Sequence, residues 1–227
     1  MTLPRAAMSP PGTAIMFREE VTNALDVGMA EVDTKDRVLA AAVELFATRG
    51  FDATSIRDIA KAMGMSISSI YHYFGNKEGI LVALIERSSR KLMRELDRVL
   101  GLDMTALDKF ELLVRTHIQL GRELNHEAKI YLVDSSELTA ETREIMRKMQ
   151  REVFDLYHDQ LAYLQQLGIV AKEHDLRLLT LNVLGVINWP LRWYHPGRTT
   201  PFDEVLGSVV GFIMRGAVRP HYLTDRS

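Results

Sequence analysis

The side chains best suited to molecular recognition lie in one short stretch, Ser66–Phe74, where hydroxyl groups, aromatic rings and an imidazole follow one another. If this stretch is a helix, Ile70 and Phe74 lie one turn apart and face inward. A helix fits the major groove of DNA, and the side chains near its amino end reach base edges. Ile67 either packs inward or faces the groove. We therefore expect DNA contacts from Ser66, Ser68, Ser69, Tyr71 and His72.

Two short helices joined by a turn are predicted to position these side chains. Residues 54–63 and 66–74 each begin with a hydroxyl residue suited to capping, and Gly64 marks the turn between them. Helices of about two turns are marginal in isolation. Packing on neighbouring helices must therefore hold the pair, as it does in a helix-turn-helix.

Longer helices are predicted on both sides of this pair. Upstream, a helix with Thr34 as its N-cap carries an apolar stripe and stops at Gly50. Downstream, a long helix begins after its cap, Asn76, and ends at Gly101. It has an apolar side and a dense band of charges elsewhere, which is typical of a helix that packs along one side only.

The stretch Thr34–Leu84 resembles the TetR family of bacterial regulators. The family's motif positions occur in order and without gaps: Gly50-Phe51, Thr54, Ile56, Ile59, Ala60, Gly64, Ser66, Ile70-Tyr71, Tyr73-Phe74, Lys77-Glu78 and Leu81. This resemblance implies a three-helix DNA-binding domain and a ligand-responsive regulator, usually a repressor. It also implies that Tyr71, Lys77 and the hydroxyl of Thr54 contact phosphates, with Arg57 a further candidate on the groove side. Many members carry a polar residue at the position of Ile67, which here either reads a thymine methyl group or packs.

The charge distribution is compatible with this resemblance, although the whole chain of 227 residues has a net charge of −2. Between Thr34 and Gly101 the sequence has eleven basic and eight acidic residues, an excess of three positive charges. The remainder therefore has a net charge of −5. Phosphate binding depends on local contacts, so a positive end on an acidic body is compatible with binding DNA.

Residues beyond Gly101 predict an all-α second domain. Helices are expected at 105–123, 126–134, 139–167, 174–194 and 201–217, the last with Thr200 as cap and Pro201 at its first position. We divide the chain into a tail at 1–33, a DNA-binding domain at 34–78, and an effector-binding and dimerisation domain at 79–227. In the tail we expect no export signal, and Met1, Met8 and Met16 are alternative starts.

A ligand cavity is expected in this second domain. His117 is interpreted either as a polar anchor in that cavity or as a histidine at the core edge, and the methionines of 139–167 either fill the core or suit flexible apolar ligands. The candidate ligand-binding residues are His117, Tyr131, Phe154, Tyr157, Asn188, Trp189, Arg192 and Trp193.

The stretch Asn188–Arg198 concentrates aromatic residues and arginines beside Pro190. It resembles the corresponding region in TetR-family regulators of fatty-acid, sterol and other acyl-CoA catabolism. The resemblance implies an acyl chain in the apolar interior, with Arg192 or Arg198 meeting nucleotide phosphates at the mouth. Another hydrophobic or aromatic effector remains open, as does a multidrug-responsive repressor of an efflux pump.

A subunit interface is expected along helices 174–194 and 201–217. The first is apolar nearly all round, and the second has a small-residue face at Gly207, Ser208 and Gly211. In proteins of the TetR family the last two helices pair with their symmetry mates, which implies a homodimer. The alternative is a close contact between the two helices of one chain.

Other classes of protein find little support. The absence of cysteine excludes disulfides, thiol nucleophiles and Cys-ligated zinc, and permits a cytoplasmic location. No phosphate loop, HExxH or GxSxG motif occurs, and the seven histidines are scattered, so we expect neither an enzyme nor a metal or other cofactor. The longest uncharged stretch is too short for a membrane span.

Overall fold

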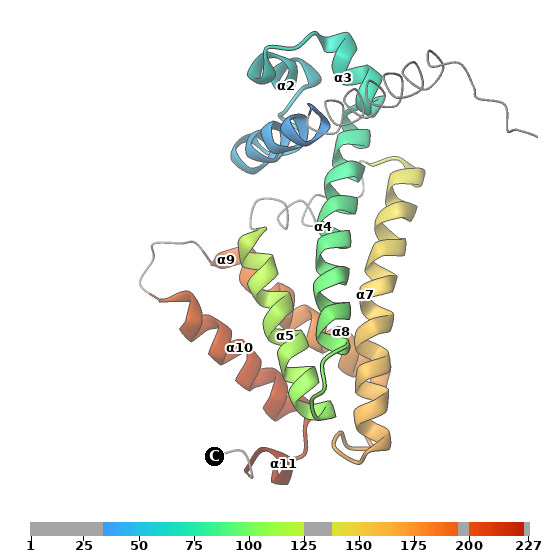
Figure 1. Ribbon diagram of the computed structural model, residues 1–227, viewed down its shortest axis with the longest axis vertical. Coiled ribbons are helices and arrows are strands. Elements are labelled where there is room, and N and C mark those ends of the chain that lie inside the picture. The colour runs from blue at the N-terminus through green and yellow to red at the C-terminus, as the bar shows by residue number, and fades with distance from the viewer. Residues whose placement is uncertain (1–33, 125–137, 195–199, 225–227) are drawn as a thin grey trace, which may run out of the picture.

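A computed structural model describes residues 34–124, 138–194 and 200–224 of the chain (Figure 1). In these ranges the secondary structure is helical, apart from a single antiparallel bridge between Val170 and Val218. This agrees with the predicted all-α class. The expected helix 126–134 lies outside the described residues.

The DNA-binding end consists of a helix at 34–49 followed by α2 (Ile56–Met63) and α3 (Ile67–Phe74). Gly64 ends α2 in the left-handed conformation, with φ +63°, which favours glycine and produces the turn into α3. Thr34 already lies within the first helix, so the prediction that it is the N-cap was wrong.

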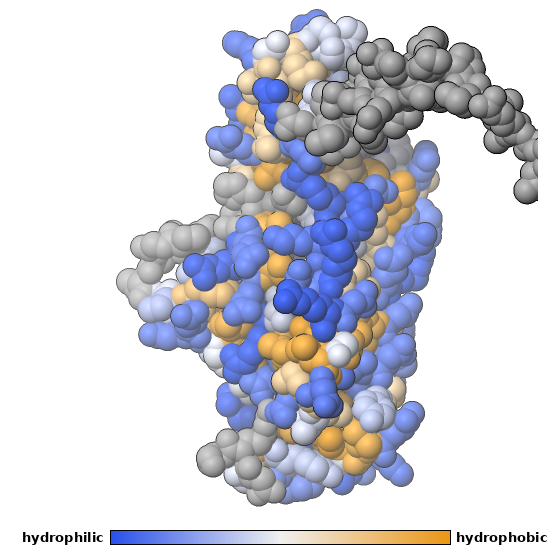
Figure 2. Space-filling view, in the orientation of Figure 1, coloured by the Kyte–Doolittle hydropathy of each residue, from blue (hydrophilic) through white to orange (hydrophobic). Residues whose placement is uncertain are grey.

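The long helix α4 (Lys77–Leu100) extends from this end into the second domain (Figure 1). Its first turn is capped by Asn76, whose side chain accepts a hydrogen bond from Gly79 N, and Gly101 ends it, as predicted. Figure 2 shows hydrophilic side chains over the upper and middle part of α4, in agreement with its charged band.

The second domain packs α4 with α5 (Ala106–Glu123), α7 (Ala140–Gln166), α8 (Leu176–Asn188), α9 (Pro190–Trp193), α10 (Phe202–Ala217) and the short α11 (His221–Thr224). Among the described helices none is both long and apolar enough to cross a membrane. The N-caps of α5 and α7 are Thr105 and Thr139, whose hydroxyls each accept a hydrogen bond from a backbone N–H of the first turn.

Two predicted helices differ from the structure because of proline. The expected helix 174–194 is broken after Asn188, since Pro190 lacks the N–H that would continue the hydrogen-bond ladder and instead begins α9. The expected helix 201–217 begins one residue later. Pro201 is itself the extended N-cap residue rather than the first helical residue, and Thr200 is not the cap.

The buried side chains form two hydrophobic cores. The N-terminal core extends from Val38 to Ile85 and also takes in Leu138 and Met146, which flank the start of α7. The second core includes Leu96 of α4 and Tyr157 of α7. Helices α4 and α7 therefore contribute to both cores and connect the two ends of the molecule.

Candidate nucleic-acid interface and effector cavity

The hydroxyl groups at the start of α3 form one exposed cluster. Ser66 Oγ, the N-cap, accepts a hydrogen bond from Ser69 N at 3.1 Å. The same oxygen lies 2.9 Å from Ser68 Oγ and 2.8 Å from Ser69 Oγ. Three hydroxyls are thus held together at a helix amino end, where the helix dipole favours negative groups such as phosphate.

The rest of α3 divides into faces as the sequence predicts. Ile70 is fully buried, whereas Tyr71 is 51% exposed and Ile67 is 38% exposed. His72 is also exposed, and Tyr73 and Phe74 are half-buried. The structure therefore presents Ile67, Tyr71 and His72 on the outside of the helix-turn-helix together with the serine cluster.

Thr54 lies inside the domain rather than on its surface. It is 1% exposed, and its hydroxyl donates to Gly50 O at 2.8 Å, with Leu45 O at 3.4 Å. The cap of α2 is its neighbour Ser55, whose side chain accepts from Asp58 N while the Asp58 carboxylate accepts from Ser55 N. The expected phosphate contact through the Thr54 hydroxyl is therefore wrong, because that group is already bonded and buried.

The two basic candidates of this region differ in their surroundings. Arg57 is exposed on α2. Lys77 Nζ donates to Phe51 O at 3.0 Å and lies 4.2 Å from the centre of the Phe51 ring. Its ammonium group therefore ties the start of α4 to the loop before α2, in addition to any contact that it makes with DNA.

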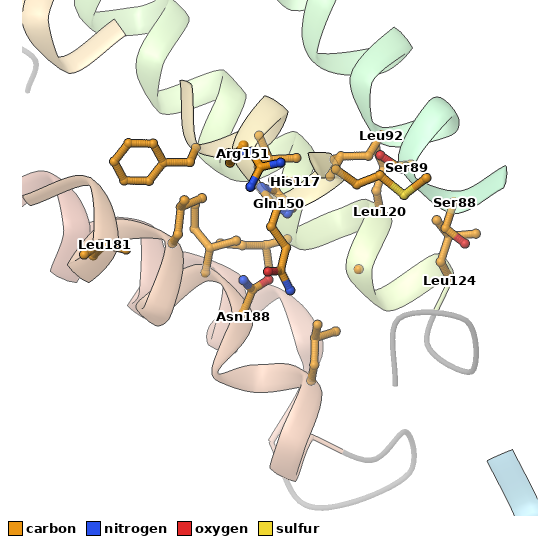
Figure 3. A pocket seen from close by; sticks show the side chains of 18 of the residues that line it. Ser88, Ser89, Leu92, His117, Leu120, Leu124, Gln150, Arg151, Leu181 and Asn188 are labelled. Atoms are coloured by element: carbon orange, nitrogen blue, oxygen red, sulfur yellow. The ribbon is translucent and has the colours of Figure 1, made fainter. Parts of the chain in front are cut away.

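A cavity of about 510 Å³ lies in the second domain, between α4, α5, α7, α8 and the start of α9 (Figure 3). Its wall is mostly apolar. The apolar lining includes Leu92, Ile118, Leu120, Leu124, Met149, Val153, Phe154, Leu181, Leu184, Ile187 and Leu191, and the polar lining includes Ser88, Ser89, His117, Gln150 and Asn188. A volume of this size suits a small organic ligand.

His117 is a buried polar residue of this wall, as are Ser88 and Ser89. Its Nδ1 lies 3.2 Å from the hydroxyl of Tyr157, which in turn donates to Leu113 O at 3.2 Å. Burial lowers the pKa of His117 from 6.5 to about 4, so the imidazole is neutral at pH 7. Burial raises the pKa of Tyr157 above its ordinary value of 10, so its hydroxyl remains protonated and can donate.

The structure brings together three of the eight predicted ligand-binding residues. His117, Phe154 and Asn188 line the cavity. Tyr157 does not, because it lies fully buried behind His117 and reaches the cavity only through it.

The aromatic and basic candidates after Asn188 are not in the wall either. Trp189 is 60% exposed, and Arg192 and Trp193 also lie on the surface, whereas their neighbour Leu191 lines the cavity. Tyr131 and Arg198 lie outside the described residues.

Two arginines that line the cavity were not among the predicted ligand-binding residues. Arg147 and Arg151 line it from α7, and both pair with Glu144, at 3.2 Å and 2.6 Å. Their side chains are more than half exposed, so they stand at the mouth. The hydrogen bond from Arg151 and the charge of Arg147 hold the pKa of Glu144 below its ordinary value. The i, i+4 spacing of the arginines on one helix was the available signal.

The DNA-binding end and the second domain are joined by a polar contact. Glu78, in the first turn of α4, accepts hydrogen bonds from Thr139 and Thr142 at the start of α7. Burial alone would raise the pKa of Glu78, but these hydrogen bonds, with the charge of Arg143, lower it. Among the described residues no cluster of three or more potential ligands could hold a metal ion.

A helix-turn-helix with an exposed polar face, attached to a helical domain with an apolar cavity, defines a DNA-binding regulator with a ligand-binding domain. The family model of bacterial regulatory proteins of the tetR family matches residues 38–84, and that of the tetracyclin repressor-like C-terminal domain matches residues 103–217. The chain therefore belongs to the TetR family of transcriptional regulators.

Individual relatives are distant but cover most of the chain. The chain is 26% identical to the HTH-type transcriptional repressor KstR2 of Rhodococcus jostii (strain RHA1), over 82% of this chain and 92% of that protein. It is 24% identical to the fatty acid metabolism regulator protein of Bacillus subtilis (strain 168), over 67% and 78%. The structure of AibR in complex with isovaleryl coenzyme A and operator DNA has a TM-score of 0.71 and 25% identity, over 79% of this chain and 97% of that one.

Proposed function

We propose that this protein is a repressor whose α3 binds operator DNA and which leaves the operator when a small apolar molecule occupies the cavity. The observation that carries the proposal is that α4 and α7 both line the cavity and both contribute to the core that supports α3. An effector must bind the DNA-free conformation more tightly than the DNA-bound one. We expect it to change the direction of α4, and with it the separation of two recognition helices that must lie roughly 34–36 Å apart.

On the DNA side, the geometry favours base contacts from the start of α3 and phosphate contacts around it. Ser66, Ser68, Ser69, Ile67 and His72 are the proposed groove residues, and Tyr71, Arg57 and Lys77 are the proposed phosphate contacts. The role of Thr54 becomes structural, since its buried hydroxyl secures the loop before α2.

The effector class that the cavity supports best is an acyl-CoA. The apolar wall suits an acyl chain, and the arginines at the mouth, Arg147 and Arg151, provide the positive charge that nucleotide phosphates require. The complex of AibR with isovaleryl coenzyme A and operator DNA supports the proposal of an acyl-CoA effector. A multidrug-type effector is the second candidate, and the predominantly apolar wall favours it over a polar metabolite.

We also propose a homodimer formed by α8, α9 and α10. Leu178, Leu181 and Phe212 are large apolar side chains that remain exposed on these helices, with Phe212 at 63%. A second copy would bury them and would produce the two-fold symmetry that palindromic operators mirror. We further propose that the protein is cytoplasmic and has no catalytic activity. The boundary between its DNA-binding and effector domains is proposed to lie near the start of α4.

A mobility-shift assay with the DNA upstream of the protein's own gene tests the proposal. Decanoyl-CoA should release the protein from this DNA at micromolar concentration, whereas coenzyme A alone should not. A protein that binds the DNA and ignores decanoyl-CoA, but responds to a panel of cationic dyes, would instead indicate the multidrug type. Failure to bind the DNA at all would contradict the assignment of α3.

A further inference from the structure

One nitrogen in the cavity wall has no hydrogen-bond partner in the part of the chain that the structure describes. His117 is 8% exposed, and the only hydrogen bond found for its ring there joins Nδ1 to Tyr157. Among the same residues, no side-chain nitrogen or oxygen is both completely buried and unpaired. Nε2 is therefore open to the cavity that His117 lines (Figure 3).

The contacts behind the ring determine what this nitrogen offers. Tyr157 has one hydroxyl proton, and Leu113 O can only accept. If that proton goes to Leu113 O, Nδ1 must carry a hydrogen and donate it to the Tyr157 oxygen, and both contacts are satisfied. If it goes to Nδ1 instead, the Leu113 contact has no hydrogen and that hydrogen bond is lost. The first arrangement leaves Nε2 as an acceptor with a free lone pair.

The protonation state agrees with this assignment. Burial keeps the imidazole neutral at pH 7, so the second nitrogen does not acquire a proton. The histidine is held from behind by the Tyr157 hydroxyl of α7, and that hydroxyl is itself bonded to the Leu113 carbonyl of α5. The acceptor is thus fixed in orientation before a ligand arrives.

We propose that the cavity selects apolar effectors that carry a hydroxyl group, which donates its hydrogen bond to Nε2 of His117. This inference rests on the proposed function of the cavity as the effector site. A ligand with only an ether or ketone oxygen would set one lone pair against another and leave a buried acceptor unpaired, which is costly. The oxygen of a hydroxyl group also accepts, and the amides of Gln150 and Asn188 in the same wall provide donors.

Two isomeric probes distinguish the alternatives. 1-Undecanol and decyl methyl ether have the same atoms and similar apolar surface, but only the alcohol can donate. Titration calorimetry with the full-length protein at pH 7 should give about tenfold tighter binding for the alcohol. Equal affinities would overturn the inference and leave the cavity as an effector site. If neither probe binds, the cavity is not a site for apolar ligands, and the proposed function fails with the inference.

The variant Tyr157→Phe tests whether the alcohol preference depends on the fixed tautomer. Without the tyrosine oxygen, Nδ1–H loses its acceptor and the proton can move to Nε2, so the preference should fall to about twofold or less. Tyr163→Phe is the matched control, because Tyr163 lies on the same helix and is half exposed outside the cavity. A full preference retained in a folded Tyr157→Phe protein would overturn the role of the tyrosine.

Nitrogen-15 NMR of histidine-labelled wild-type protein gives a second measurement that needs no variant. His117 should show a protonated Nδ1 and an unprotonated Nε2 at pH 7. Addition of 1-undecanol should shift the Nε2 resonance, and decyl methyl ether should not shift it. A protonated Nε2 in the free protein would contradict the inference directly.

Discussion

The carboxylate of Glu78 accepts hydrogen bonds from both the backbone N–H of Thr139, at 3.2 Å, and its hydroxyl, at 2.6 Å. Thr139 is the N-cap of α7, and Glu78 lies in the first turn of α4, directly after the helix-turn-helix. One side chain of the DNA-binding end therefore completes the cap of a helix that lines the cavity. The contact joins the start of α7 directly to the start of α4.

Glu78→Gln should lower the free energy of unfolding by about 1 to 3 kcal/mol at pH 7, because charge-assisted hydrogen bonds are replaced by weaker ones. The folded-state pKa of Glu78 lies below its ordinary value, so its contribution is complete above about pH 4.5 and is lost as the pH falls through the folded value. Urea unfolding of the two proteins across pH 3 to 7 measures this difference. Glu141→Gln, an exposed change in the same turn of α7, is the control, and a difference between Glu78→Gln and wild type that does not shrink in acid would contradict the prediction.

Gly79→Ala should disturb the junction between α3 and α4. A Cβ at this position would lie 1.9 Å from Phe74 O, which is backbone and cannot move independently of α3. We expect a loss of stability of about 1 to 3 kcal/mol, measured by urea unfolding, and weaker binding of operator DNA. Gly216→Ala is a matched control, since a Cβ there meets nothing within 4 Å and the change in a helix should be neutral or slightly stabilising. Equal stability of the two variants would show that the junction tolerates the methyl group.

Tyr71 and Lys77 should respond differently to substitution. Tyr71→Phe removes an exposed hydroxyl and should weaken operator binding about tenfold without changing the melting temperature.

Lys77→Met should destabilise the protein by about 1 to 2 kcal/mol, because the ammonium group of Lys77 bonds Phe51 O and covers the Phe51 ring. Fluorescence anisotropy at several salt concentrations tests the phosphate contact of Lys77, whose loss should reduce the salt slope by about 1. An unchanged slope would leave Lys77 with the structural role alone.

Leu184→Trp should fill the cavity and uncouple the effector from the operator. Leu184 is half-buried in the wall contributed by α8, so a larger ring there extends into space that a ligand would need. Operator affinity should stay within about twofold of wild type, whereas the decanoyl-CoA concentration needed for release should rise at least about tenfold. Leu167→Trp, at an exposed position outside the cavity, should leave release unchanged. Normal release from Leu184→Trp would place the effector elsewhere.

Features set by local chemistry were predictable from the sequence. The cap Asn76 and the stop Gly101 identified α4 to the residue, and the inward position of Ile70 followed from helical spacing. Errors arose where neighbouring residues compete for one role. Thr54 and Ser55 both suit an N-cap, and Asp58 decides between them by completing a capping box with Ser55.

The cavity was harder to predict because its wall combines side chains of five helices, from α4 to α9, that span about a hundred residues of sequence. Ser89 of α4 and Arg151 of α7 line the same space only because α4 and α7 pack together. The cluster of Trp189, Arg192 and Trp193 stands out in the sequence, yet it lies on the surface. Composition identifies side chains suited to binding, whereas the direction of each side chain depends on tertiary packing.

Helix α7 contributes to both cores, and this affects how the protein can change during evolution. Phe154 touches the ligand space and Met146 belongs to the core below α3, and the two are separated by about 12 Å of helix. Substitutions around Phe154 can alter the cavity without changing Thr139, which bonds Glu78, or Met146, which lies in the N-terminal core. The two regions meet at Met149, which lines the cavity and also packs against the N-terminal core, so a change of inducer that keeps the operator is easiest at positions beyond Met149.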